Sequence, residues 1–161
     1  MLKIIKSMQE LDSQQLIAVY NESILENAKQ LFVEIPQAEE AFLSYLREDF
    51  FRQKGAFYGV FVEDNIYKSA LRLEPYGDGL LLQGLETAPA YRNLGYAGAL
   101  LRDVLEYLKS VGNAKVYSHI HKRNGQSLHL HQKCGFEIIA DTAAYIDGTV
   151  TQNSYTLLIN L

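Results

Sequence analysis

Three β-rich runs follow one another between residues 56 and 87, separated only by short turns. Asp64-Asn65 is a two-residue hairpin signal between the runs 56–63 and 66–74, and a turn at 76–79 leads into the run 80–87. Links this short join antiparallel neighbours, because a parallel pair needs a crossover of about a dozen residues or more. The sequence therefore predicts an antiparallel meander of three strands.

The strongest helical pattern of the chain starts near Gly95, directly after the meander. Apolar residues recur there at three- and four-residue spacing, and charged residues occupy the opposite face. Gly112 ends the pattern. The apolar face consists of Ala97, Leu100, Leu101, Val104, Leu105, Leu108 and Val111.

The remaining segments supply strands and helices on either side of this unit. One predicted helix starts at Asp12 or Ser13 and continues through Tyr20 to Ile24, and a second follows Pro36. A short helix is predicted over 127–133, and strands over 2–6, 115–120, 136–145 and 154–161. This order predicts an α/β (α+β) fold, with a mixed sheet and helices on both faces.

Length and composition indicate one globular domain over residues 1–161. The net charge of -4, without runs of like charge, excludes the basic footprint of a nucleic-acid binder. No stretch approaches the ~20 apolar residues of a membrane span, and the N-terminus has no secretory pattern. Because Cys134 is the single cysteine, no internal disulfide forms. We expect a cytoplasmic protein.

The turn Arg92-x-x-Gly95-x-Ala97 connects the last meander strand to the strongest helix. The first turn of a helix has unpaired N–H groups and a positive dipole end, so it can hold a pyrophosphate. Gly95, Ala97 and Gly98 let phosphates approach the backbone, and Arg92 adds a cation. The alternative is that Gly95 only relieves a tight turn and that Arg92 is a solvated charge. A dinucleotide fingerprint is excluded, because it requires a parallel β-α-β unit.

These residues resemble the GNAT superfamily of acyl-CoA N-acyltransferases. Its signature, Gln/Arg-x-x-Gly-x-Gly/Ala, opens a helix after a strand and matches Arg92, Gly95 and Ala97. A second block, residues 124–136, resembles the family pattern Asn-x-x-Ser/Ala-x-x-Leu-Tyr-x-Lys-x-Gly-Phe. Residues 1–55 and 141–161 match only in the order of their elements. The resemblance implies a GNAT fold whose mixed, mostly antiparallel central sheet has about seven strands.

The resemblance also implies a site for acetyl-CoA as the acyl donor. In the family, the strand before the signature splays from its neighbour at a bulge and pairs with pantetheine, while the signature turn holds the pyrophosphate. A plain turn at Asn124 and an ordinary helix cap at Ser127 are the alternatives to contact with pantetheine. The implied cofactor-binding residues are Leu85, Glu86, Thr87, Arg92, Asn93, Leu94, Gly95, Tyr96, Ala97, Gly98, Asn124, Ser127 and His131.

His131 occupies the position where many family members have the tyrosine that protonates the leaving CoA thiolate. Imidazole, with a reference pKa of about 6.5, can serve as that donor. The alternative is a half-exposed histidine without a chemical task. The acceptor amine must in turn lose a proton, and Glu86 on the splayed strand is the first candidate for the general base, acting through water; Glu74 and Tyr145 are weaker candidates. A solvated carboxylate is the alternative for Glu86.

The histidine pairs 119/121 and 129/131 do not predict a metal site. Residues two apart share a face on a strand but not on a helix, and zinc sites usually collect three or four converging ligands. Cys134 is predicted to be a small buried residue, because direct transfer to an amine needs no acyl-enzyme.

Together, these features predict direct transfer of an acetyl group from acetyl-CoA to a primary amine of a small molecule, peptide or protein. The acceptor pocket is expected between the loops 29–37 and 141–152, which carry Phe32, Glu34, Tyr145 and Asp147. A non-catalytic acyl-CoA-binding regulatory module and an unrelated α/β interaction domain are the alternatives. A homodimer formed through exposed C-terminal strands is a further expectation.

Overall fold

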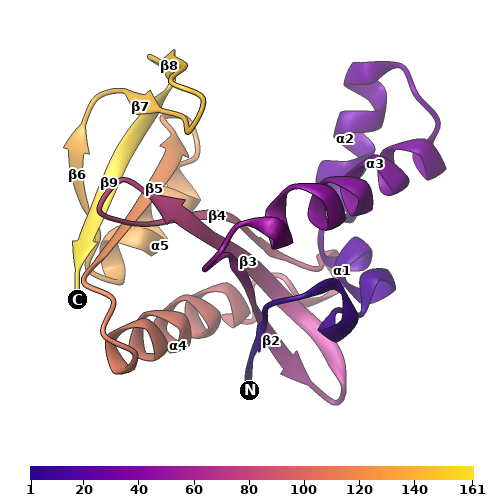
Figure 1. Ribbon diagram of the computed structural model, residues 1–161, viewed down its shortest axis with the longest axis horizontal. Coiled ribbons are helices and arrows are strands. Elements are labelled where there is room, and N and C mark those ends of the chain that lie inside the picture. The colour runs from indigo at the N-terminus through magenta and orange to yellow at the C-terminus, as the bar shows by residue number, and fades with distance from the viewer.

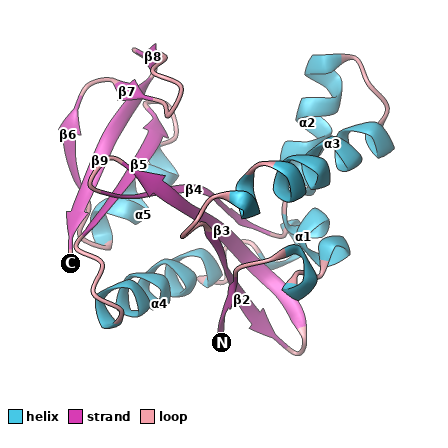
Figure 2. Cartoon of the chain, in the orientation of Figure 1, coloured by secondary structure: helices cyan, strands magenta, loops and turns pink.

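The computed structural model describes all 161 residues and contains a seven-stranded sheet with helices on both faces (Figures 1 and 2). The strand order is β1-β2-β3-β4-β5-β9-β6, in which β4 and β5 form the single parallel pair. A separate hairpin pairs β7 with β8. The predicted fold class is confirmed. The strands are β1 Leu2–Ile5, β2 Phe57–Glu63, β3 Ile66–Tyr76, β4 Gly79–Thr87, β5 Lys115–His121, β6 Glu137–Ala140, β7 Ala143–Ala144, β8 Val150–Thr151 and β9 Ser154–Asn160.

Two apolar clusters hold the helices to the two faces of the sheet. The helices are α1 Ser13–Val19, α2 Asn21–Leu31, α3 Ile35–Glu48, α4 Tyr96–Ser110 and α5 Gly125–Lys133. The first three pack with Tyr58, Val60 and Ala70 on one face. Helix α4 packs on the other, where its leucines meet Leu82 of β4 and Val116 of β5. None of the helices combines the length and apolar character needed to cross a lipid bilayer.

The N-terminal helices differ from the prediction at Tyr20. The single helix expected across this residue is divided into α1 and α2, because Tyr20 leaves helical geometry with φ -91° and ψ 14°. Its hydroxyl donates a hydrogen bond of 2.5 Å to the carbonyl oxygen of Gly84. Helix α3 begins at Ile35, so Pro36 lies inside its first turn, where a missing N–H costs nothing.

The predicted strand 136–145 is also interrupted. Strand β6 ends at Ala140 after a register shift against β9, and the chain then forms the β7–β8 hairpin within the loop predicted over 141–152. Thr156 of β9 donates a 2.7 Å hydrogen bond to the carbonyl oxygen of Thr142, which holds the chain where it leaves the sheet. In Figure 1 this hairpin and the α2–α3 pair project toward the same side of the molecule.

Candidate active site

The two central strands separate soon after they start to pair. Strand β4 pairs with β5 only from Leu80 to Leu82, opposite Val116 to Ser118. Beyond this point β4 continues to pair with β3, and β5 with β9, so an opening forms between β4 and β5. The register of β3 and β4 shifts at Gly84, whose φ of 59° favours glycine. The resemblance to the GNAT superfamily implies such a splay and bulge.

A cavity of about 630 Å³ lies between this opening and the N-termini of α4 and α5. It brings together most of the residues implied as cofactor-binding: Leu85, Glu86, Thr87, Arg92, Asn93, Gly95, Tyr96, Ala97, Gly98, Asn124 and Ser127. Leu94 is absent from the lining, and its side chain is largely exposed. His131 lines a neighbouring cavity instead.

The start of α4 presents backbone N–H groups to the larger cavity. Gly95 is the N-cap with φ 87°, no side chain caps the helix, and Asn93 also has a positive φ of 60°. The first intrahelical hydrogen bond joins the N–H of Ala99 to the carbonyl of Gly95, so the earlier N–H groups have no helical partner. Such a helix end favours an anion.

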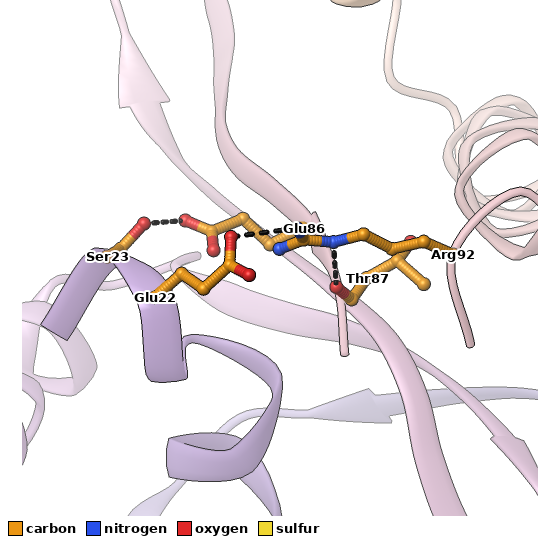
Figure 3. Close-up of polar contacts among 5 residues, drawn as sticks. All are labelled: Glu22, Ser23, Glu86, Thr87 and Arg92. Atoms are coloured by element: carbon orange, nitrogen blue, oxygen red, sulfur yellow. Dashed lines mark hydrogen bonds and ion pairs between the residues drawn. The ribbon is translucent and has the colours of Figure 1, made fainter. Parts of the chain in front are cut away.

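Arg92 is held by two groups on the protein itself (Figure 3). One guanidinium nitrogen lies 2.7 Å from a carboxylate oxygen of Glu22 on α2, and Nε donates to the carbonyl oxygen of Thr87 at 3.3 Å. Arg92 is therefore an exposed charge that already has partners within the protein. Its contact with pyrophosphate stays a prediction and requires competition with Glu22.

Other cations line the same cavity and were not assigned from the sequence. Arg102 lies one helical turn after Gly98, and its guanidinium packs beside that glycine; Lys133 ends α5. The spacing of four residues on α4 was an available signal for Arg102, and Lys133 stands in the second motif block. Tyr91, Gln126, His129 and Leu130 complete the lining.

Asn124 and Ser127 form the cap of α5. The Asn124 side-chain oxygen accepts a 3.1 Å hydrogen bond from the backbone N–H of Ser127, so Asn124 is the N-cap and Ser127, for which a helix cap was the alternative, lies inside the first turn. This bond uses only the oxygen of the amide, and the NH₂ group keeps its two donors. Because Asn124 lines both cavities, those donors lie where an extended ligand would pass.

The smaller cavity, of about 390 Å³, lies in the opening between β4 and β5. Ser118 of β5 and His131 of α5 lie on the α4–α5 side of the sheet, since Ser118 shares its face of β5 with Val116 and Ile120 of that core. His119 points to the opposite side. Glu86 also faces that side, where it contacts α2. The cavity therefore has different polar groups on the two faces of the sheet.

His131 is buried, which contradicts the half-exposed alternative. Its Nδ1 lies 2.8 Å from the carbonyl oxygen of Ser127, and this ring nitrogen must carry the hydrogen because a carbonyl only accepts. Its Nε2 lies 3.4 Å from Oγ of Ser118. Burial lowers the pKa of His131 from 6.5, so the resting ring is neutral at neutral pH.

Glu86 is a partly buried carboxylate, and Figure 3 shows its contact with Ser23. Ser23 of α2 donates a 2.5 Å hydrogen bond to its Oε1. Burial raises the pKa of Glu86 above 4.5, against the opposing effects of the Ser23 hydrogen bond and of Arg92. Ser23 and Glu22 belong to no motif that the sequence shows. They reach the site because folding brings α2 to the end of β4.

The other candidates have structural partners. Glu74 is buried and accepts hydrogen bonds from Gln53 and Gln83. Glu34 caps α3, and Phe32 is almost fully exposed, so neither lines a cavity near the opening. No group of three or more His, Cys, Asp and Glu residues that could hold a metal ion is present. Cys134 is a free, partly buried thiol, and burial raises its pKa.

Comparison with known proteins identifies related sequences and folds. The model of the acetyltransferase (GNAT) family matches residues 17–136. Streptothricin acetyltransferase from Streptomyces lavendulae is 19% identical over 93 residues, which cover 58% of this chain and 49% of that protein. The chain thus spans about half the length of this curated relative.

Solved structures share the whole fold at low sequence identity. PaiA N-acetyltransferase from Thermoplasma acidophilum, in complex with coenzyme A, has a TM-score of 0.69 and 18% identity, covering 100% of this chain and 99% of that one. An acetyltransferase from Streptococcus agalactiae 2603 has a TM-score of 0.68 and 15% identity, covering 99% and 98%.

Proposed function

Since the chain belongs to the GNAT family of acetyltransferases, we propose that it transfers the acetyl group of acetyl-CoA directly to a primary amine. Residues 1–161 act as one catalytic domain in this proposal. Amine and thioester react within a ternary complex, without an acyl-enzyme. The acceptor is a small molecule or an amine of a peptide or protein.

The observation that carries this proposal is the 630 Å³ cavity, which joins the free N-terminus of α4 to the opening between β4 and β5. A ligand with a pyrophosphate at one end and an extended arm at the other fits this arrangement. The N–H groups of the α4 turn, Arg102 and Lys133 bind the phosphates. The arm lies along Leu85 to Thr87, whose backbone no longer pairs with β5, and the Asn124 amide donates to it.

The thioester then lies in the smaller cavity between two groups of opposite function. Glu86 accepts the proton of the acceptor ammonium through water, and its raised pKa makes it a better base than an exposed carboxylate. His131 protonates the departing thiolate from the other face of the sheet. Because the resting ring is neutral, it first takes up a proton from solvent, and the negative charge that develops on sulfur favours this protonated form. Holding amine and thioester together supplies most of the rate.

Binding of acetyl-CoA is tested by calorimetry on the purified protein. Lys133→Glu places a negative charge in the cavity and should weaken binding at least about tenfold. Lys109→Glu makes the same charge change at the exposed end of α4 and serves as the matched control, with unchanged affinity. Equal affinities of both variants and the wild type would remove the cavity as the cofactor site.

Catalysis is tested by release of free CoA thiol in the presence of a panel of primary amines. Thiol release that requires both acetyl-CoA and an amine supports the transferase. Tight binding of acetyl-CoA without thiol release from any amine would favour the regulatory acyl-CoA-binding module instead.

A further inference from the structure

His119 belongs to a histidine pair that the function proposed above does not use. It directly follows Ser118, the last residue of β5 that pairs with β4, and it lines the smaller cavity. Both of its ring nitrogens are buried and have no hydrogen-bond partner in the protein. A neutral imidazole has one donor and one acceptor, and leaving such groups buried without partners is unfavourable. The site thus favours a ligand that pairs with this ring.

Two tyrosines fix the orientation of the His119 ring. The ring of Tyr76 on β3 lies edge-on to it with centroids 5.4 Å apart, and that of Tyr145 next to β7 does the same at 5.7 Å. The Tyr76 hydroxyl donates a 2.5 Å hydrogen bond to the carbonyl oxygen of Ala144, which ties the hairpin to β3. The imidazole is therefore held in place, as a group that transfers protons must be.

His119 faces the side of the sheet from which the amine approaches. It alternates along β5 with Ser118, which contacts His131, so these two histidines lie on opposite faces at the same end of the opening. Glu86 of β4 lies on the same face as His119 and lines the same cavity. An amine bound beside Glu86 thus meets the thioester next to His119.

We propose that His119 is a second proton acceptor, which takes the proton that the acceptor nitrogen loses after it has attacked the thioester carbon. This proposal rests on the acetyl transfer proposed above. An alkylammonium has three N–H bonds and the product amide has one, so two protons must leave the nitrogen. Glu86 accepts the first through water, which frees the nitrogen lone pair for the attack.

The remaining steps balance around the tetrahedral adduct. The new C–N bond forms while the carbonyl π electrons move to oxygen, and the nitrogen becomes positively charged. His119 then removes the second proton. As the adduct collapses, the C–S bond breaks, sulfur keeps the electron pair, and His131, which has taken up a proton from solvent, gives that proton to sulfur. Glu86 and His119 then lose the two protons that they accepted. One proton per turnover is finally released to solvent.

The surroundings of His119 suit this task. Burial alone lowers the pKa of His119 from 6.5, so the ring is neutral at neutral pH and has a free lone pair. The groups packed against it are the rings of Tyr76 and Tyr145, and no charged residue contributes to the shift.

Two substitutions separate proton transfer from packing. His119→Phe keeps an aromatic ring between the tyrosines but has no nitrogen, and His119→Gln keeps a polar group that is a poor base. Both should lower kcat at least about a hundredfold in the thiol-release assay, with an acceptor identified by the amine panel. The affinity for acetyl-CoA and the melting temperature should stay close to those of the wild type. Tyr117→Phe, on the same face of β5 but outside both cavities, is the control and should keep full kcat.

Chemical rescue gives a readout that a purely structural role would not produce. Imidazole added to His119→Ala should enter the space between the tyrosines and restore a large part of kcat, whereas it should not restore Glu86→Gln. If His119→Phe keeps kcat within about threefold of the wild type, the ring only packs and the proposal is overturned. A wild-type protein that binds acetyl-CoA but acetylates no amine refutes the transfer itself, and the role of His119 with it.

Discussion

At the scale of single residues, the charge state of Glu86 depends on partners from three parts of the chain. Ser23 binds its Oε1, the nearby Arg92–Glu22 pair adds charges of both signs, and burial disfavours the ionised form. The net result is a raised pKa, which makes the carboxylate a better base. The same burial has a cost in stability whenever the group is ionised.

Replacing Glu86 with glutamine should therefore remove activity and stabilise the fold. Because the folded-state pKa lies above the unfolded value of about 4.5, ionisation costs stability as the pH rises through the folded pKa. The variant should melt about 1–4 °C above the wild type at neutral pH, and this difference should disappear below about pH 4.5. Thermal melts followed by circular dichroism at both pH values measure it. A variant that is less stable at neutral pH would show that the Ser23 contact outweighs the burial cost.

The acid role of His131 gives a second prediction at this scale. Removing a general acid usually costs about 10²–10⁴ in rate, so His131→Ala should lower kcat far more than it raises the KM for acetyl-CoA. In the wild type, kcat should fall as the pH rises through the pKa of His131, which burial places below 6.5. His131→Tyr should recover much of the rate and move this limb to higher pH. Near-normal kcat in His131→Ala would assign the proton to water or to another side chain.

At the scale of elements, the bulge at Gly84 turns β4 away from β5. A Cβ atom at Gly84 would lie 3.3 Å from the hydroxyl of Tyr20, which already donates to the Gly84 carbonyl. The positive φ adds backbone strain for any other residue. The bulge, Tyr20 and the break between α1 and α2 are thus parts of one arrangement.

Gly84→Ala should destabilise the protein by about 1–3 kcal/mol and also lower its activity. Gly77→Ala is the matched control, because Gly77 has a similar φ of 54° but open space around it in the β3–β4 turn. The control should lose stability from backbone strain alone and keep its kcat. Denaturant unfolding and thiol release measure the two effects. Equal kcat in the two variants would show that the bulge does not position the site.

Local signals in the sequence predicted most of the elements. The Asp64-Asn65 hairpin and the α4 pattern depend on neighbouring residues, and both form as predicted. Helix α5 also forms, but it begins at Gly125, two residues before the predicted start, with Asn124 as its N-cap. The break at Tyr20 has no glycine or proline to mark it; a hydrogen bond to distant Gly84 accompanies it. For the same reason Ser23, Glu22 and the environment of His119 could not be predicted, since α2, β3 and β7 reach the opening only in the folded chain.

At the scale of the whole molecule, the sheet consists of two antiparallel parts joined by three residue pairs, Leu80 to Leu82 with Val116 to Ser118. The apolar core beneath α4 connects both parts, because it includes residues of β3, β4, β5 and β9. The opening is therefore a fixed feature between two supported half-sheets. At the far edge, β6 exposes Ile138 and Ile139, and pairing of two copies there stays a prediction that sedimentation can test.

The early end of the β4–β5 pairing leaves main-chain amides that should exchange quickly with deuterated water. From Gln83 to Thr87, β4 pairs with β3 along one edge, and its other edge has no strand partner. Backbone groups that are buried normally find partners. CoA, which cannot turn over, should slow exchange in peptides covering 83–87 and in the turn 93–98, and leave β1 unchanged. Slowing at the turn alone would mean that the arm of CoA does not follow β4. The exchange pattern thus reports how CoA lies in the site, and it does so without an identified acceptor amine.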